Sequence, residues 1–335
     1  MKQILYTIGF LFLVLWLMAS VDQEILEKAT QGDAAAQFKL GDMYLEGINV
    51  EQDYIEAIKW HRLAANQGHA SAQNGLGYIY TNGLGVSKDY IEAFKWYSLA
   101  ADQGNAFAQT NLAFLYLKGM GVSRNYTKAA KWFKLAADQG DKEAQYNMGL
   151  LYEKGYGFVV DNKLAKSYYL EASQKGHAGA QYRMGTMYHF AKGIKKDLSE
   201  AVKWYHLSGA QGFADANYNL GLAYQFGDGV KIDIKSAIKH FELAATTGHT
   251  AAQYNLGVIL SPEEMGFMGT TVTVVHPQID IEKAFFWFIL AAESEDSRVA
   301  KLASNNRDVI AKKLSKTQIE RTYNKVAEWV PKQVP

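Results

Sequence analysis

Two apolar stripes alternate along the chain, and each has the spacing of one face of a helix. Ala36, Leu40 and Tyr44 follow one another every four residues, which predicts a short helix, called helix A here. After a loop, a second stripe predicts a helix B and consists of Ala57, Trp60, Leu63 and Ala64. The tryptophan column of helix B continues as Trp96, Trp132, Tyr168, Trp204, His240 and Trp287. We expect this column to pack neighbouring helices together.

The same pattern recurs with a fixed period of 36 residues. Each period contains a glycine, and the glycines are Gly32, Gly68, Gly104, Gly140, Gly176, Gly212 and Gly248. Five residues after each glycine stands an amide side chain, at Gln37, Gln73, Gln109, Gln145, Gln181, Asn217 and Gln253. The chain is therefore an array of about seven helix-turn-helix repeats, which start near residues 32, 68, 104, 140, 176, 212 and 248.

Helix B has a defined start and a defined end. An Asp or Asn stands where an N-cap is needed, and its side-chain oxygen can accept a hydrogen bond from the first turn. These residues are Asp53, Asp89, Asn125, Asp161, Asp197 and Asp233. Helix B ends at the recurring glycine, because glycine adopts the left-handed conformation past a helix at no side-chain cost.

One repeat cannot fold alone. Ordering 36 backbones costs roughly 36 to 72 kcal/mol, while burial of one tryptophan returns only about 5 kcal/mol. Repeats must therefore stack, and we predict them across 32–303. We predict an N-terminal capping helix at 21–31 and a C-terminal capping helix with a tail at 304–335. An insert at 261–279 interrupts the last repeat, and it is interpreted either as a tolerated hairpin or flap or as a partner-contact loop.

The first 20 residues are a targeting segment rather than part of the fold. An apolar run from Ile4 to Met18 follows Lys2, and no charge appears before Asp22. As a helix this run would span about 22 Å, short of the hydrocarbon layer, which favours a removable signal peptide. Residues 4–21 could instead form an uncleaved membrane anchor. We therefore expect an exported protein, periplasmic or extracellular, with membrane anchoring as the alternative; N-terminal sequencing of the mature protein separates the two.

Composition excludes several classes of function. The chain has 35 Lys and Arg against 34 Asp and Glu, with a net charge of +1, so nucleic acid is not an expected partner. It has no cysteine, which rules out disulfides, thiolate zinc sites and cysteine nucleophiles. His69, His177 and His249 are far apart in sequence and are expected in turns. We therefore expect neither a metal site nor a cofactor.

Two motifs resemble catalytic signatures, but each lacks the accompanying sequence features of such a site. Loops at Gly83, Gly119, Gly155 and Gly227 contain Gly-x-Gly, but no strand precedes them, so they are interpreted as tight turns between helices. Ser236 and Lys239 match Ser-x-x-Lys, yet the companion Ser-Asp-Asn and Lys-Thr-Gly motifs are missing. His240 replaces a tryptophan of the packing column and is interpreted as a core histidine. We therefore predict no catalytic residue.

Several segments resemble the Sel-one-like repeat (SLR) family, which is related to the tetratricopeptide repeats. They are Gly104-Asn-Ala-Phe-Ala-Gln-Thr-Asn-Leu-Ala, Gly-Leu-Gly-Val at 83–86, Ala93-Phe-Lys-Trp96 and Leu99-Ala-Ala101. The resemblance covers roughly residues 22–330. It implies an all-α fold, namely a right-handed α/α superhelical solenoid. It also implies an adaptor or scaffold function, and many family members are exported bacterial proteins. Some cysteine-rich members have β-lactamase-type names, but this chain lacks their disulfide cysteines.

A polar column beside the core stripe of helix A is the candidate binding site. It consists of Asn111, Asn147, Arg183, Asn219 and Asn255. By resemblance to tetratricopeptide proteins, these side chains would face a concave groove and bind the backbone of a peptide. The alternative is that the amides join neighbouring helices. Exposed anchors would lie next to the column, at Lys118, Lys154, Phe190 and Phe226.

We therefore predict a non-catalytic scaffold or adaptor that binds a protein or peptide partner in the groove of helix A. Contact with a membrane is expected only through an uncleaved N-terminal segment. A cell-wall or β-lactam hydrolase is the first alternative, prompted only by names within the family. An intracellular signalling adaptor is the second, and the uncharged N-terminal run disfavours it.

Overall fold

The computed structural model describes residues 23–262, 266–267, 270–271 and 279–332. The predicted targeting segment at 1–20 and most of the insert at 261–279 lie outside these residues. Within the described part, no helix is both long and apolar enough to cross a membrane.

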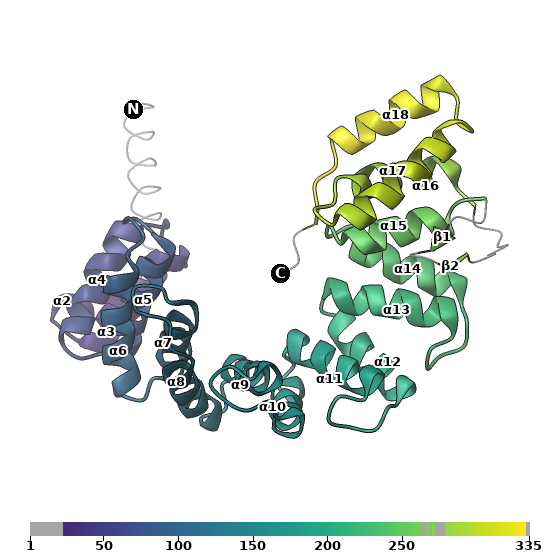
Figure 1. The fold of residues 1–335 in the computed structure, drawn as a ribbon. Coiled ribbons are helices and arrows are strands. Elements are labelled where there is room, and N and C mark those ends of the chain that lie inside the picture. Colours follow the sequence, from purple (N-terminus) through teal and green to yellow (C-terminus); the bar gives the residue numbers. More distant parts are fainter. Residues whose placement is uncertain (1–22, 263–265, 268–269, 272–278, 333–335) are drawn as a thin grey trace, which may run out of the picture. The chain divides into compact units, whose positions relative to one another are not determined.

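Each repeat forms the expected pair of helices (Figure 1). The A helices are α3 (Ala34–Glu46), α5 (Ala70–Asn82), α7 (Ala106–Lys118), α9 (Lys142–Lys154), α11 (Ala178–Phe190), α13 (Ala214–Phe226) and α15 (Thr250–Ile259). The B helices are α4 (Tyr54–Asn66), α6 (Tyr90–Asp102), α8 (Tyr126–Asp138), α10 (Asn162–Gln174), α12 (Leu198–Gly209), α14 (Ile234–Ala245) and α16 (Ile281–Ala292). The array of helical hairpins predicted from the sequence is therefore confirmed.

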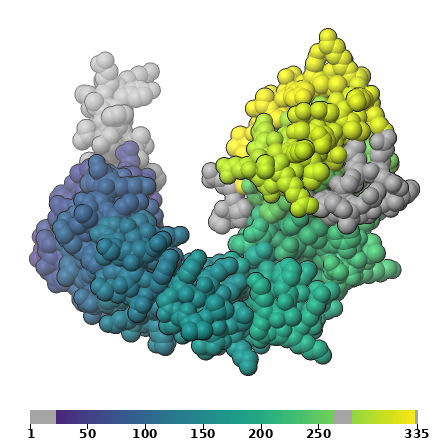
Figure 2. Space-filling model, viewed as in Figure 1, coloured from purple at the N-terminus to yellow at the C-terminus, as the bar shows by residue number. Residues whose placement is uncertain are grey.

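The chain divides into two compact halves, Met1–Asp161 and Asn162–Pro335, called the N-terminal and C-terminal halves here. Consecutive helices pack against one another from α2 to α9 in the N-terminal half and from α10 to α17 in the C-terminal half, while α18 packs against α16 (Figure 1). The space-filling view shows a continuous packed body in each half (Figure 2). The right-handed superhelix stays a prediction.

Additional elements flank the repeats and interrupt the last one. Helix α2 (Gln23–Thr30) precedes the first repeat, as expected. Helices α17 (Ser297–Ala311) and α18 (Lys316–Ala327) follow the last repeat, and a capping box of Ser315 and Gln318 begins α18. The boundary predicted at 303 falls inside α17, so two helices rather than one follow the last repeat, and both pack against α16. In the insert, β1 (Gly266–Phe267) and β2 (Thr270–Thr271) pair antiparallel.

Side chains cap the helices at both predicted and unpredicted places. Asp53 and Asp89 accept hydrogen bonds from the first turn of α4 and α6, as expected. His69, His177 and His249, predicted only as turn residues, are N-caps of A helices. The Nδ1 atom of each accepts a backbone N–H three residues later, at 3.0–3.2 Å. These histidines therefore have a structural role.

The central packing column differs from the predicted one. Trp96, Trp132 and Trp204 are only half-buried, and Leu63 is 43% exposed. The rings one position after the tryptophan column are completely or almost completely buried, and they belong to His61, Tyr97, Phe133, Tyr169, Tyr205, Phe241 and Phe288. Five of these rings lie against a glycine of the preceding A helix, at Gly41, Gly77, Gly185, Gly221 and Gly257. Trp60 and Trp287 are buried, so the tryptophan column packs helices in part, but the ring column next to it forms the centre of the stack.

The recurring glutamine connects one repeat to the next. Gln109 of α7 is buried, and its Nε2 donates to the carbonyl oxygen of Ala101, at the end of the preceding B helix, at 3.2 Å. Its Oε1 accepts a hydrogen bond from Nε2 of Gln139 at 2.8 Å. The donation to the residue eight positions earlier recurs from Gln37, Gln73, Gln145, Gln181, Asn217 and Gln253. A buried amide ladder thus joins the repeats within each half.

We expect Gln109→Met to lower the free energy of unfolding by about 1–3 kcal/mol, because it removes two hydrogen bonds from a buried position while keeping the volume. Gln139 is exposed and supplies only the outer bond, so Gln139→Met should cost less. Urea unfolding of both single variants and the double variant measures the coupling between the two side chains. Full additivity would show that this hydrogen bond does not stabilise the stack.

Candidate interaction surface

The predicted asparagine column lies largely inside the helix packing. Nδ2 of Asn111 donates to Oδ1 of Asn74 in the preceding A helix at 3.1 Å. Asn147 is buried and donates to the carbonyl oxygen of Glu143, one turn earlier in α9. Asn255 is fully buried, with Nδ2 3.4 Å from the hydroxyl of Tyr218. The contacts of Asn111 and Asn255 agree with the helix-joining alternative, whereas Asn147 is bonded within its own helix.

The remaining two members of the column are partly buried. Asn219 lies near the hydroxyl of Tyr205, whose pKa is raised by burial. The guanidinium of Arg183 lies 5.9 Å from the centre of the Tyr182 ring. Asn219 therefore lies beside a buried tyrosine, and Arg183 beside the ring of its neighbour in α11.

The predicted anchors are exposed, and each is the last residue of an A helix. Lys118 and Lys154 end α7 and α9 in the N-terminal half. Phe190 and Phe226 end α11 and α13 in the C-terminal half and are 62% and 42% exposed. All four are accessible to a partner. The asparagines differ from them because their amides take part in the packing.

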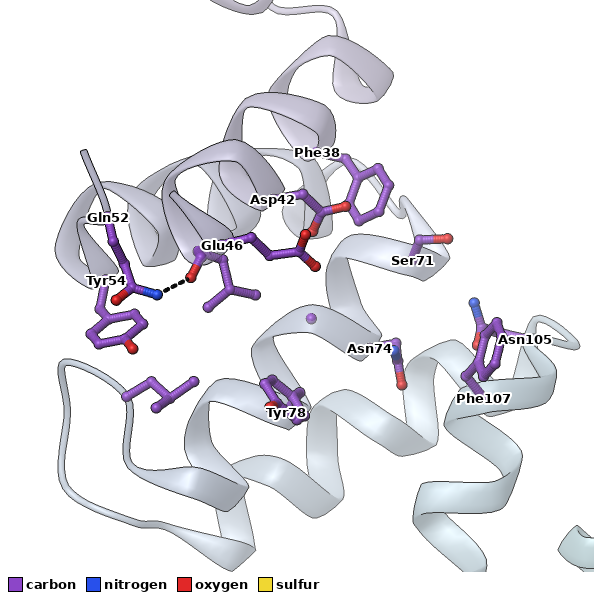
Figure 3. Close-up of a pocket in the computed structure, with 13 residues that line it drawn as sticks. Phe38, Asp42, Glu46, Gln52, Tyr54, Ser71, Asn74, Tyr78, Asn105 and Phe107 are labelled. Carbon is purple, nitrogen blue, oxygen red and sulfur yellow. Dashed lines mark hydrogen bonds between the residues drawn. The ribbon is translucent and has the colours of Figure 1, made fainter. Parts of the chain in front are cut away.

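A groove that the sequence did not reveal lies across the A helices of the first three repeats. Its volume is about 650 Å³, and it is lined by side chains of α3, α5 and the start of α7 (Figure 3). Two of its aromatic side chains are largely exposed, with Tyr78 at 48% and Phe107 at 67%. Asp42 and Glu46 lie one turn apart on α3, and both line the groove. The surface therefore combines aromatic rings with two carboxyl groups.

A buried histidine lies behind one of these carboxyl groups. The side chain of His61 is completely buried, and its Nε2 lies 3.4 Å from Oδ1 of Asp42. Neither ring nitrogen has a hydrogen-bond partner among the described residues. Burial lowers the pKa of His61 to about 4, so the ring is neutral at pH 7. Burial and the nearby Glu46 raise the pKa of Asp42 to about 6.

Two departures from the repeat pattern lie at this groove or directly behind it. His61 occupies the column that holds tyrosine or phenylalanine in the other repeats, and Gly75 occupies the predicted asparagine column. A β-carbon at Gly75 would lie 3.1 Å from the His61 ring, so the glycine leaves room for the imidazole. These two substitutions, together with the acidic pair one helical turn apart, are the signal that could have located the groove.

Comparison with known proteins identifies the repeats. The Sel1 repeat family matches seven consecutive segments, at residues 34–69, 70–105, 106–141, 142–177, 178–213, 214–249 and 250–296. The chain belongs to the Sel1 repeat family. The first residue of each matched segment is the first residue of an A helix, so the sequence repeats and the structural repeats coincide.

Two solved Sel1-type structures are similar to the chain over most of its length. The first is c5321, a protective antigen of uropathogenic Escherichia coli strains that displays an SLR fold, with 33% identity and a TM-score of 0.73. The match covers 91% of this chain, and the chain spans 64% of the length of that structure. The second is a Sel1 repeat protein from Oxalobacter formigenes, with 35% identity, a TM-score of 0.60, and coverage of 64% of this chain and 86% of that one. No curated protein sequence matches the chain.

Membership in the Sel1 repeat family also indicates the general class of function. Sel1 repeat proteins are generally protein-interaction scaffolds of a non-catalytic type. In the Ser-x-x-Lys motif, Oγ of Ser236 donates to Oδ2 of the helix cap Asp233 at 2.7 Å. His240 stacks on Tyr224, with ring centres 5.6 Å apart, and its Nδ1 lies 2.9 Å from Oδ1 of Asn217. Both residues therefore take part in the structure of their Sel1 repeat.

Proposed function

We propose that the chain is a protein-interaction scaffold whose N-terminal half holds an extended segment of a partner protein in the groove across α3, α5 and α7. The observation that carries the proposal is the groove itself, with two largely exposed aromatic rings at Tyr78 and Phe107. Aromatic side chains at an accessible surface are the residues that most often supply binding energy between proteins.

The build of the N-terminal half supports binding without rearrangement. Most of the lining residues project from helices, and the buried Gln73 and Gln109 join those helices to their neighbours. Ordering of the groove is therefore part of folding, and a partner would not have to supply it on binding. A segment that crosses these three A helices would reach Phe38, Tyr78 and Phe107.

Capture of partners by the purified protein tests this function. We expect Tyr78→Ala/Phe107→Ala to reduce recovery of the bound partner at least about tenfold, because both rings are lost from the binding surface. Leu63→Ala/Leu99→Ala is the matched control, since these leucines are 43% and 49% exposed on B helices and do not line the groove. Circular dichroism shows whether helicity is kept. Equal recovery with both double variants would exclude the groove as the binding site.

A further inference from the structure

The two carboxyl groups of the groove have no basic partner. Asp42 and Glu46 face the space between α3 and α5 (Figure 3). Within the described residues, neither forms an ion pair with a lysine or arginine. Elsewhere in this half, Glu56 pairs with Lys59 at 2.9 Å, and Asp138 pairs with Lys134 at 2.7 Å. Like charges one helical turn apart repel each other, so the groove keeps an uncompensated negative charge.

The histidine behind the groove does not supply the missing positive charge. His61 contacts Asp42 at 3.4 Å, but its lowered pKa keeps the imidazole neutral at pH 7. His69, whose ring stacks on Phe38 with centres 4.8 Å apart, also has a pKa lowered by burial. The His61 imidazole is completely buried behind Asp42, and neither ring nitrogen has a hydrogen-bond partner among the described residues, so it leaves the charge of this carboxyl group uncompensated.

The walls favour a planar cation over a compact one. Phe38, Tyr78 and Phe107 contribute aromatic rings, while Ser71 and Asn74 contribute neutral polar groups. None of the residues that line the groove is lysine or arginine. A guanidinium can stack on aromatic rings and bind carboxylates through two parallel hydrogen bonds, which an ammonium cannot do. The charge and the shape of the groove are therefore complementary to an arginine side chain.

We propose that the groove binds an arginine of the partner segment, with the guanidinium at Asp42 and Glu46 and a flanking apolar residue against Tyr78 and Phe107. This inference rests on the proposed function, because it specifies the chemistry of the segment that the groove holds. Bound arginine would replace the repulsion between the two carboxylates with charge-assisted hydrogen bonds.

Fluorescence anisotropy with labelled Gly-Phe-Arg-Phe-Gly and its citrulline analogue tests the proposal. Citrulline keeps the planar shape and removes the charge, so we expect the arginine peptide to bind at least about tenfold more tightly. Asp42→Asn/Glu46→Gln should abolish that preference. Glu27→Gln/Asp102→Asn makes the same change in net charge at exposed positions outside the groove and should leave the preference unchanged.

The preference for arginine should also depend on pH. Asp42 has a raised pKa of about 6, so it takes up a proton as the pH falls from 7.5 to 5 and loses its attraction for a cation. We therefore expect the affinity for the arginine peptide to fall over this range, while that of the citrulline peptide changes little. The other titratable groups around Asp42 are Glu46, His61 and His69. Asp42 loses its charge within this pH range because its pKa is raised to about 6. His61 gains its charge only below this range because its pKa is lowered to about 4.

Equal affinity for the two peptides, or an equal loss with the control pair, would overturn the inference. The proposed function would stand in that case if partner capture still depended on Tyr78 and Phe107. Removal of a repulsion should keep or raise the midpoint of thermal unfolding of Asp42→Asn/Glu46→Gln at pH 7.5. Glu46→Gln alone changes an exposed position and tests the same proposal. We expect it to reduce the preference for the arginine peptide by about threefold.

Discussion

Replacement of Phe241 by alanine should lower the free energy of unfolding of the C-terminal half by about 3–5 kcal/mol. The Phe241 ring is completely buried between α13 and α14 and lies so close to Gly221 that a β-carbon there would be 2.5 Å from it. The neighbouring Tyr218 ring is 6.0 Å away, centre to centre. Because glycine has no side chain that could fill the space, the alanine variant leaves a cavity, and both the lost contacts and the cavity contribute to the cost.

Leu243→Ala is the matched control for this prediction. Leu243 lies two residues further along the same helix and is 46% exposed, so its truncation should change the free energy of unfolding by less than about 0.5 kcal/mol. Chemical denaturation followed by circular dichroism measures both variants. Similar losses for Phe241→Ala and Leu243→Ala would show that the buried ring column is not the centre of the stack.

The repeat, the helices and most of their caps could be predicted because they depend on short-range sequence patterns. Asp53 lies three residues before Glu56, and its cap hydrogen bonds are local, so they do not depend on how the repeats stack. The identity of the deepest ring could not be read in this way. Trp96 and Tyr97 are adjacent and both aromatic, and only the packing against Gly77 shows that Tyr97 is the buried one.

The candidate site was harder to predict than the fold. The sequence places Asn111 beside the core stripe of helix A, where an amide can face either a groove or a neighbouring helix. Its bond to Asn74, 37 positions earlier, depends on how two repeats stack. The groove combines side chains from three repeats. Gly75, which lines it, and His61, which is buried behind it, are exceptions to the repeat pattern. The sequence period reflects the residues that the repeats share, so it does not indicate a site formed by residues that differ between repeats.

This scaffold contains two kinds of position, those that recur in every repeat and those that vary between repeats. Columns that recur in every repeat, such as the ring of Phe241 and the amide of Gln109, are buried and join helices. Positions that vary between repeats, such as Glu46 and Phe107, are exposed and line the groove. Binding specificity can therefore change through the variable positions while the recurring ones keep the stack intact.

Gly121→Ala should lower the free energy of unfolding of the N-terminal half by about 2–5 kcal/mol. Gly121 is the second glycine of a Gly-x-Gly loop and has a φ of +67°, a region that costs a residue with a side chain roughly 1–2 kcal/mol. A β-carbon there would also overlap the backbone carbonyl of Tyr90, at the start of the preceding B helix. The loop and that helix would have to move apart, which adds about 1–3 kcal/mol.

Gly104→Ala separates these two contributions. Gly104 also has a positive φ, of +88°, but a β-carbon there would meet no atom within 4 Å. Its substitution should therefore cost only the conformational part, about 1–2 kcal/mol, in the same denaturation experiment. A clearly larger loss at Gly121 would show that the loop bears on the preceding repeat. Equal losses would mean that the Gly-x-Gly loops serve only as turns, and that contacts between repeats are confined to the rings and the glutamine ladder.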